Sequence, residues 1–314
     1  MINSYLAAPN RVAFSIFGVD IMWYGIMIAT GMMLALMLGY YRVKRHGLNE
    51  EYVIDIGLAC LPFAIVGARL YYVIFSWDLY KDNLLQIFNL RAGGLAIHGG
   101  LIFGIGLGLY MMKRRKQNVI QWLDLSPPSI ALGQAIGRWG NYFNGEAHGT
   151  PTDLPWAIEV DGVMVHPTFL YESLWCFFLC FFLWWYHDSG RRKFEGQTIC
   201  LYLILYSIER FFVEGLRTDS LMIGPLRQAQ VISVFLALLG VVCWVVFSKR
   251  DARMKAAAVE TVCTEEIIGG IYAQESAECE QENSAAETAE SICASETSGE
   301  IAASKIADQS SADE

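Results

Sequence analysis

Seven long apolar stretches constrain the fold of this chain more than any other feature. Each holds about 20 mostly apolar residues, the length that an α-helix needs to cross the hydrocarbon core of a membrane. A hydrophobic content of 54% also exceeds what is typical of soluble domains. We therefore expect an all-α polytopic membrane bundle of about seven transmembrane helices. The stretches are Val19–Tyr41, Val53–Phe75, Leu95–Met112, Val119–Gly137, Thr168–His187, Gln197–Gly215 and Gln228–Phe247.

Two of these stretches contain residues that a membrane helix tolerates only with help from its surroundings. Pro127 and Pro128 interrupt the fourth stretch, which is the weakest of the seven. Such breaks are tolerated where neighbouring helices or water satisfy the freed backbone groups. Arg69 lies within the second stretch, and we expect an acidic or carbonyl partner for it.

The basic residues indicate an orientation. Lys and Arg cluster after the first, third, fifth and seventh stretches, at residues 42–45, 113–116, 191–193 and 249–255, and the intervening loops are poorer in them. The positive-inside rule places these four segments in the cytoplasm. We therefore expect the N-terminus outside and the C-terminus in the cytoplasm, which an odd number of spans allows.

The charge is distributed unevenly along the chain. The net charge is −9, but residues 256–314 carry −13 and residues 1–255 carry +4. The acidic segment is rich in Ala, Ser, Glu and Thr and holds too little apolar surface to fold alone. We expect a transmembrane domain over residues 1–255 and a disordered, cytoplasmic acidic tail over residues 256–314.

The composition also argues against several kinds of site. No basic stripe with interleaved aromatic residues is present, so nucleic acid is not an expected partner. None of the eight cysteines falls in a predicted outside loop, which argues against a disulfide framework. No cysteine pair has metal-ligand spacing with a nearby histidine.

The densest group of polar residues is the segment GRWGNYFNGEAHG, Gly137–Gly149, expected as a long outside loop that begins where the fourth stretch ends. It places Arg138, Asn141 and Glu146 among several glycines, which allow a close approach of backbone to ligand. Arginine offers a rigid fork of donors that matches phosphate oxygens. This pattern favours a binding site over an ordinary polar loop at a helix end.

A second group lies inside the sixth stretch, in YSIERFFVEGLR. Tyr206, Arg210 and Glu214 are spaced i, i+4, i+8, so they share one helix face, and Arg217 follows three residues later. A charged group near the bilayer centre costs about 2.5–3.5 kcal/mol on insertion scales. The stripe should therefore face the bundle interior or a wet cavity. An internal Arg–Glu pair that only fixes the packing is the structural alternative.

Two weaker signals involve histidines near the expected outer surface. His98, in GGLAIHGGLIFG, is a candidate general base, because histidine as a residue type is suited to proton transfer near neutral pH, and its flanking glycines leave space around the ring. A satisfied structural histidine is the alternative. In HPTFLYE, Tyr171 and Glu172 are candidates to line a cavity, and His166 fits a cap or a loop contact. These segments and Arg138 all lie toward the outside, where a cavity with two arginines would hold a lipid phosphate.

Four segments together resemble the bacterial prolipoprotein diacylglyceryl transferase family. They are IHGGLIFG, GRWGNYFNGEAHG, HPTFLYES and YSIERFFVEGLR, in this order, and the resemblance covers about residues 14–250. It implies a plasma-membrane enzyme that moves the diacylglyceryl group of phosphatidylglycerol onto the thiol of a lipobox cysteine in the signal peptide of a prolipoprotein. A thioether forms and glycerol 1-phosphate leaves. No metal or organic cofactor is expected.

The resemblance also implies roles for individual residues. Arg138 and Arg210 would grip the lipid phosphate, and His98 would be a candidate base for the substrate thiol. Tyr206 and Glu214 match the stripe that holds Arg210. Tyr206 and the arginine pair are the other candidates for the deprotonation. Asn141, Glu146 and Gly149 match the signature segment. Tyr24 and Arg217 match further polar positions of unassigned role.

Other functions use similar residues. A transporter or a lipid-binding protein would also carry buried Arg and Glu, but the chain shows no convincing internal repeat of the kind found in many transporters. A receptor-like seven-helix bundle would bind a ligand without turnover. The formation of a lipidated peptide distinguishes the transferase from both.

Overall fold

The computed structural model describes residues 10–89 and 93–258. The chain divides into two compact units, Met1–Asp251 and Ala252–Glu314. Nearly all of the acidic tail expected at residues 256–314 lies outside the described residues, as do Cys263, Cys279 and Cys293. The five cysteines within the described residues are free thiols, in agreement with the expectation that no disulfide framework exists there.

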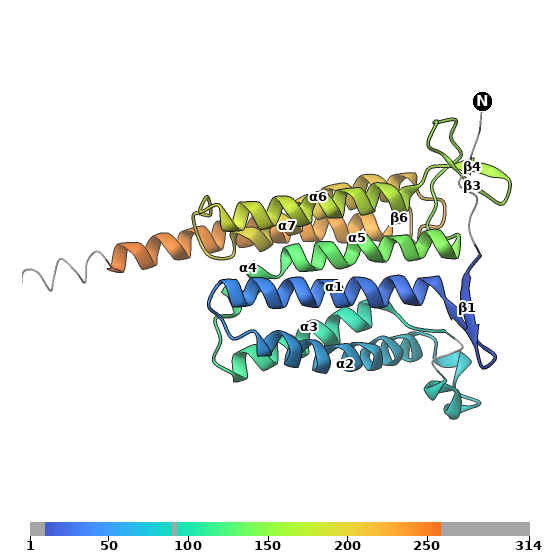
Figure 1. The fold of residues 1–314 in the computed structure, drawn as a ribbon, viewed down its shortest axis with the longest axis horizontal. Coiled ribbons are helices and arrows are strands. Elements are labelled where there is room, and N and C mark those ends of the chain that lie inside the picture. The colour runs from blue at the N-terminus through green and yellow to red at the C-terminus, as the bar shows by residue number, and fades with distance from the viewer. Residues whose placement is uncertain (1–9, 90–92, 259–314) are drawn as a thin grey trace, which may run out of the picture. The chain divides into compact units, whose positions relative to one another are not determined.

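Helices dominate the described chain (Figure 1). They are α1 (Trp23–Arg45), α2 (Glu51–Phe75), α3 (Ile97–Arg114), α4 (Val119–Leu125), α5 (Pro127–Asn144), α6 (Thr168–Asp188), α7 (Gln197–Leu216) and a last helix, Gln228–Ala258. Two short 3-10 helices, η1 (Trp77–Leu79) and η2 (Leu84–Phe88), follow α2. Three antiparallel hairpins complete the fold: β1 (Val12–Ile16) with β2 (Val19–Met22), β3 (Ile158–Val160) with β4 (Val163–Val165), and β5 (Met222–Ile223) with β6 (Leu226–Arg227).

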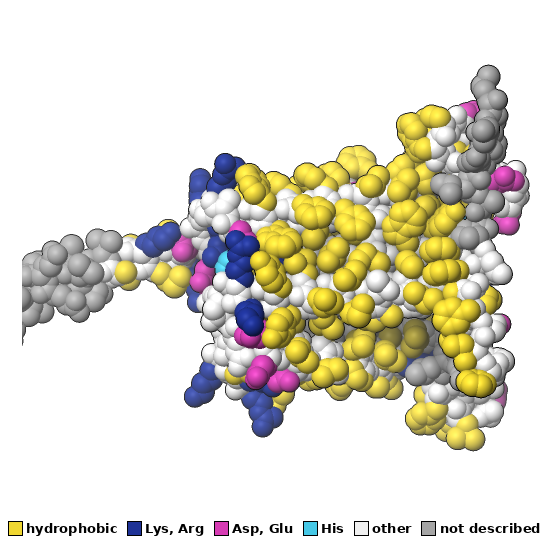
Figure 2. All heavy atoms as spheres, in the orientation of Figure 1, with side chains coloured by type: hydrophobic (Ala, Val, Ile, Leu, Met, Phe, Trp, Pro, Cys, Tyr) yellow, Lys and Arg dark blue, Asp and Glu magenta, His cyan; other side chains and the backbone are white. Residues whose placement is uncertain are grey.

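Four of these helices are long and apolar enough to cross a membrane: α1, α2, α6 and the last helix. The other long helices, α3, α5 and α7, are shorter or more polar than these four. The predicted all-α membrane character therefore agrees with the described chain. Figure 2 shows apolar side chains over the middle of the helical bundle, which is the arrangement that contact with lipid requires.

Two predicted boundaries are wrong. Residues 19–22 were expected in the first helix but form strand β2, which pairs with β1 across the turn at Phe17–Gly18. The fourth apolar stretch is two helices, because α4 ends at Leu125 and α5 begins at Pro127. Proline is accommodated in the first turn of a helix, where its missing N–H has no intrahelical partner.

The helices that carry the polar residues of interest pack through a small apolar core. Helix α5 lies against α1 and α6, and α6 lies against α7 (Figure 1). Their shared core consists of Ala131 on α5, Leu179, Cys180 and Leu183 on α6, and Tyr202 on α7. The hydroxyl of Tyr202 donates a hydrogen bond of 2.7 Å to Gln134 on α5. This packing holds α5, α6 and α7 in a fixed relation.

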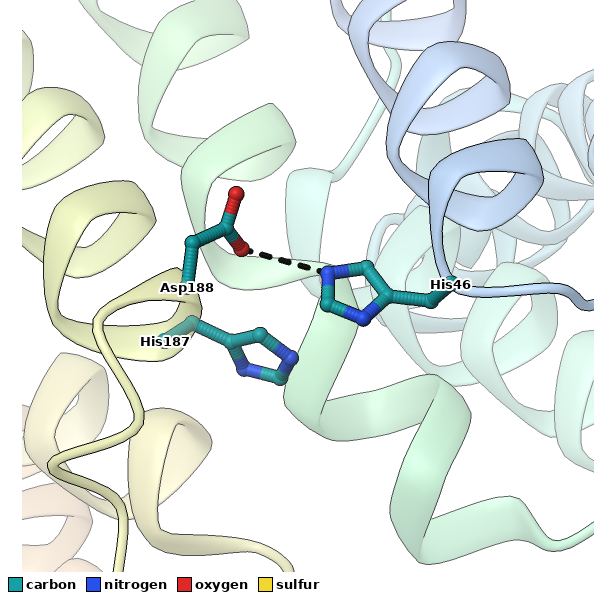
Figure 3. Close-up of side chains that lie close together, drawn as sticks. All are labelled: His46, His187 and Asp188. Carbon is teal, nitrogen blue, oxygen red and sulfur yellow. Dashed lines mark hydrogen bonds and ion pairs between the residues drawn. The ribbon is translucent and has the colours of Figure 1, made fainter.

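Charged side chains gather at the end of the bundle where α4 lies, and several of them form ion pairs (Figures 1 and 2). The carboxylate of Asp188, the last residue of α6, lies 3.1 Å from Nε2 of His46, just past α1 (Figure 3). Two arginines of α1 approach the same carboxylate: Arg42 at 3.8 Å and Arg45 at 3.5 Å. A ring nitrogen of His187 also lies within 4.8 Å of the ring nitrogen of His46 and the carboxylate oxygen of Asp188. Since the guanidinium groups neutralise Asp188, we interpret the cluster as a structural link between α1 and α6.

Asp124 on α4 caps the N-terminus of α7. Its fully buried carboxylate accepts hydrogen bonds from the backbone N–H groups of Thr198 and Ile199, at 2.6 and 3.0 Å, and pairs with Arg192 at 2.7 Å. Helix N-termini expose unpaired N–H groups that a carboxylate stabilises. Helix α7 has no capping side chain of its own, since Gly196 precedes it.

We expect Asp124→Ala to destabilise the protein by about 2–4 kcal/mol, because it removes a cap and leaves a partly buried Arg192 without its partner. Thermal unfolding of the detergent-solubilised protein measures the loss. Asp55→Ala is the matched control, because Asp55 forms an exposed ion pair with Arg115, which is worth about 1 kcal/mol or less. Equal stabilities of the two variants would contradict the capping role.

Candidate active site

A buried carboxylate joins three helices at the centre of the candidate site. Glu172 of α6 is 1% exposed and lies between two guanidinium groups. Oε2 of Glu172 is 2.6 Å from Nη2 of Arg138 on α5, and Oε1 accepts a hydrogen bond of 2.9 Å from Nη1 of Arg210 on α7. A charge of this kind is buried only when it is paired. Glu172 therefore brings the two predicted phosphate-binding arginines together.

The predicted stripe on α7 is confirmed as one face of the helix. Arg210 pairs with Glu214 one turn later, at 2.9 Å, and Arg217 lies 4.0 Å from the same carboxylate. Tyr206 occupies the preceding turn, and its hydroxyl accepts a hydrogen bond of 3.3 Å from Nη2 of Arg138. The stripe thus faces α5 and α6, as the cost of lipid exposure requires.

The two arginines retain donors for a ligand. Their side chains are 19% and 16% exposed, whereas Glu172 is enclosed. Arg138 uses Nη2 for both of its polar contacts, and within the described residues no hydrogen bond occupies its Nε or Nη1. A guanidinium has five N–H donors in a planar fork. The free part of the fork of Arg138 matches an oxygen-rich anion such as a phosphate.

The signature segment is partly helix and partly loop. Its first eight residues are the last two turns of α5, which corrects the expectation of a loop from Gly137 onward. The helix ends where Gly145 adopts the left-handed conformation, with φ of 64°. Directly after this turn, Glu146 accepts hydrogen bonds from the side-chain amides of Asn141 and Asn144, at 3.0 and 3.3 Å. Asn141 lies one helical turn beyond Arg138, so these residues continue the arginine cluster toward the helix end.

An open hollow of about 400 Å³ adjoins this group. Tyr24 of α1, Asn144 and Glu146 line it, together with Arg11 and Met22 of the N-terminal hairpin region. The ring of Tyr24 lies over Gly140 of α5, where an added Cβ would be 2.9 Å from Cδ2 of the ring. The hollow gives a polar ligand access to Asn144 and Glu146.

Gly149 is required by close packing of three segments. Its N–H donates a hydrogen bond of 2.9 Å to the carbonyl of His166, and it forms a β-bridge with Arg217 on its other side. A Cβ at this position would lie 2.6 Å from Cβ of His166. The loop after α5 is therefore held between the start of α6 and the end of α7, which fixes Arg217 beside the candidate site.

Asp219 anchors the same loop from the segment after α7. Burial alone would raise the pKa of the Asp219 carboxyl, but hydrogen bonds of 3.0 Å from Arg217 and one from the backbone N–H of Ala147 outweigh it and hold the pKa below its ordinary value. The carboxylate therefore stays ionised near neutral pH and keeps Arg217 oriented.

Comparison with known proteins identifies the family of the chain. A family model described as prolipoprotein diacylglyceryl transferase matches residues 11–246. The chain belongs to the prolipoprotein diacylglyceryl transferase family. The expected resemblance is thus confirmed, and the acidic tail lies beyond the matched residues.

Three relatives show how far the similarity extends. The chain is 52% identical over 242 residues to a protein of Clostridioides difficile (strain 630), covering 77% of this chain and 97% of the relative. It is 53% identical over 241 residues to one of Finegoldia magna, with the same coverage. A protein of Clostridium kluyveri is 46% identical over 255 residues, covering 78% of this chain and 99% of the relative. All three are named phosphatidylglycerol–prolipoprotein diacylglyceryl transferase.

His98, the candidate base that the resemblance implies, lies on a different pair of helices. It is the second residue of α3, and its ring lies 6.3 Å from the ring of Tyr71 on α2, centroid to centroid. Within the described residues, no hydrogen bond or ion pair joins His98 to Arg138 or Arg210. The flanking glycines do not simply leave space around the ring, because Gly99 packs against the backbone of Gly67 on α2.

The sequence did not predict the positions of two residues of the candidate site, Glu172 and Asp219. Glu172 was only a candidate for the cavity wall, and the structure places it between both arginines. A carboxylate in the second turn of a helix that is otherwise rich in Phe, Leu and Trp was the available signal. Asp219 was not considered, because its contacts with Arg217 and Ala147 arise from loop packing that no local pattern reveals.

Proposed function

We propose that this protein transfers the diacylglyceryl group of phosphatidylglycerol to the thiol of the lipobox cysteine of prolipoproteins, the first step of bacterial lipoprotein maturation. The observation that carries the proposal is the pairing of Arg138 and Arg210 on one buried carboxylate, with donors of Arg138 left free. Membership in the transferase family and the names of relatives about 50% identical support it. These names support the substrate class, and the geometry of the two arginines supports the site assignments.

In the proposed reaction, the sulfur of the substrate cysteine attacks the glycerol carbon that bears the phosphate oxygen. A C–S bond forms, the C–O bond breaks, and the electron pair stays on the oxygen of the departing glycerol 1-phosphate. Arg138 and Arg210 hold the phosphate and stabilise the charge that develops on it. Glu172 and Glu214 keep the two guanidinium groups oriented.

The thiol must lose its proton for the attack, because the thiolate is the nucleophile. His98 is the proposed acceptor, and Tyr206, whose hydroxyl is hydrogen-bonded to Arg138, would accept the proton only as its phenolate. The positive field of the arginine pair lowers the cost of the thiolate. Within the described residues, no hydrogen bond occupies a ring nitrogen of His98, which leaves the ring available to a substrate. Asn141, Glu146 and Gly149 shape the adjoining rim, where the hydroxyls of the lipid headgroup would bind.

The proposed topology has seven crossings of the bacterial plasma membrane, with the N-terminus outside and the C-terminus in the cytoplasm. The crossings are α1, α2, α3, α5 with α4 at its start, α6, α7 and the last helix. Its support is that the basic segments after α1, α3 and α6 lie at the end of the bundle where α4 lies (Figure 2). The arginine cluster and the rim then open toward the outer face.

Turnover by the purified protein tests the proposal. The protein in detergent is incubated with phosphatidylglycerol and a synthetic peptide that bears a lipobox cysteine, and mass spectrometry follows the products. We expect a diacylglyceryl peptide and released glycerol phosphate, both absent with a Cys→Ser peptide. Lipid binding without either product would contradict the transferase and favour a transport or lipid-binding protein.

We propose that residues 1–255 form the transferase domain and that the acidic residues 256–314 are not needed for chemistry. The family match ends at residue 246, and 97% of the Clostridioides difficile relative aligns with only 242 residues of this chain. Deletion of residues 256–314 is therefore expected to leave the transfer rate within about twofold, a change of about 0.4 kcal/mol in the barrier. An inactive truncation with normal membrane insertion would contradict this division.

A further inference from the structure

Arg69 makes an unusual set of contacts that the proposed reaction does not use. It lies near the end of α2 and is 5% exposed. All of its hydrogen bonds go to backbone carbonyls of the segment between α2 and α3, at 2.7–3.1 Å. The acceptors are Gln86, Ile87, Asn89, Gly93 and Gly94.

These contacts turn the backbone of the segment toward the protein. A guanidinium has five N–H donors, and here five carbonyls receive them. Gly94 is pressed so closely on Arg69 and Tyr72 that an added Cβ would collide with both, and its φ of 76° also favours glycine. The expected carbonyl partner of Arg69 is therefore confirmed, and it consists of carbonyls in the turn around η2 and of those of Gly93 and Gly94 before α3.

The side chains of the same segment point outward and are apolar. Leu85 and Phe88 of η2 are 80% and 81% exposed. Trp77, Leu79 and Leu84 are also exposed. Figure 2 shows apolar side chains over the corresponding part of the molecule, at the lower right. Asp78 and Lys81 of the same segment form an exposed ion pair with each other. The segment therefore has both a polar and an apolar side.

The position of the segment identifies what covers this apolar surface. It leaves α2, a helix long and apolar enough to cross a membrane, directly after Phe75. Backbone that is not helical is tolerated at membrane depth only where protein groups satisfy its carbonyl and N–H groups. Arg69 satisfies five such carbonyls, and Trp77 is a residue type that favours the membrane–water interface.

We infer that the segment Trp77–Asn89 is an interfacial membrane anchor, whose carbonyls are satisfied by Arg69 and whose apolar side chains insert among the acyl chains of the adjacent leaflet. This surface is distinct from the arginine pair and binds lipid without chemistry. The contacts at this end of α2 also fix the start of α3. Arg69 binds the carbonyl of Gly94, and the N–H of Ala96 donates a hydrogen bond of 3.0 Å to the carbonyl of Ala68. Both residues lie only a few positions before His98.

Photo-crosslinking of the full chain in lipid tests the inference. p-Benzoylphenylalanine, which reacts with nearby C–H bonds, replaces Leu85 or Phe88, and the protein is irradiated in vesicles of phosphatidylglycerol and phosphatidylethanolamine. Intact-mass spectrometry counts phospholipid adducts. Ile74 on the exposed face of α2 is the positive control, and the exposed Asp82 is the control from the same segment.

We expect adducts at Leu85 and Phe88 at yields similar to that at Ile74 and several-fold above that at Asp82. Arg69→Lys supplies three donors in place of five, so in this background the yield at Leu85 should fall while the yield at Ile74 is unchanged. Yields at Leu85 and Phe88 no higher than at Asp82 would overturn the inference. Crosslinks to a second copy of the chain in place of lipid would also overturn it.

Discussion

Arg138→Ala is expected to lower the rate of diacylglyceryl transfer by about 10²–10³-fold, the usual cost of removing one donor that stabilises transition-state charge. Arg138 approaches Glu172 at 2.6 Å, but no described residue bonds to its Nε or Nη1, so these donors are the ones available to the phosphate. The rate is measured as diacylglyceryl peptide formed per unit time at saturating phosphatidylglycerol.

Two further variants sharpen this experiment. Arg138→Lys keeps the charge but not the planar fork, and we expect it to recover only part of the activity. Arg191→Ala is the matched control, because Arg191 is exposed and its guanidinium lies over the ring of Trp185 on the surface of α6. Wild-type turnover by Arg138→Ala, in protein that inserts normally, would remove Arg138 from the proposed phosphate site.

Glu172→Ala is expected to destabilise the protein by about 3 kcal/mol and to abolish most of the activity. It removes the carboxylate that pairs with both Arg138 and Arg210 and weakens the compensation of these two like charges. Glu172→Gln retains an acceptor of the same shape, so it should lose less stability. Thermal unfolding in detergent measures the first effect, and the transfer assay measures the second.

Glu195→Ala serves as the control for Glu172, since Glu195 is exposed and accepts a single side-chain hydrogen bond from Asn118. Its stability should change by about 0.5 kcal/mol or less, as for most surface substitutions. If Glu172→Ala were as stable and as active as Glu195→Ala, the carboxylate would not organise the arginine pair.

The helices of the second half of the chain are those that the sequence predicts best. The stretches expected at Thr168–His187 and Gln197–Gly215 correspond to α6 and α7 within one residue at each end. Long apolar runs with Gly or Pro at their ends determine such boundaries locally. By contrast, residues 19–22 are as apolar as a helix start, and their strand depends on pairing with β1, which composition does not reveal.

The candidate site was predictable where its residues lie on one element. The i, i+4, i+8 spacing of Tyr206, Arg210 and Glu214 specified their common face before any packing was known. The contact of Arg138 with Glu172 depends on how α5 packs on α6, and spacing along the chain contains no information about it. Periodicity therefore predicts faces, whereas the partner across each face follows from tertiary packing.

The glycines around His98 illustrate the same limit. Their number suggested open space for a substrate, but Gly99 lies against the backbone of α2 and Gly94 against Arg69. Small residues allow membrane helices to approach closely, and this role has the same sequence signature as a ligand site. Only the structure distinguishes the two for these residues.

A crystal structure of the protein with bound phosphatidylglycerol tests the central claim most directly. The account predicts the lipid phosphate within about 3 Å of guanidinium nitrogens of both Arg138 and Arg210, with Glu172 still between them. A phosphate bound elsewhere, for example at Arg42 and Arg45 at the opposite end of α1, with both site arginines free of lipid, would contradict it.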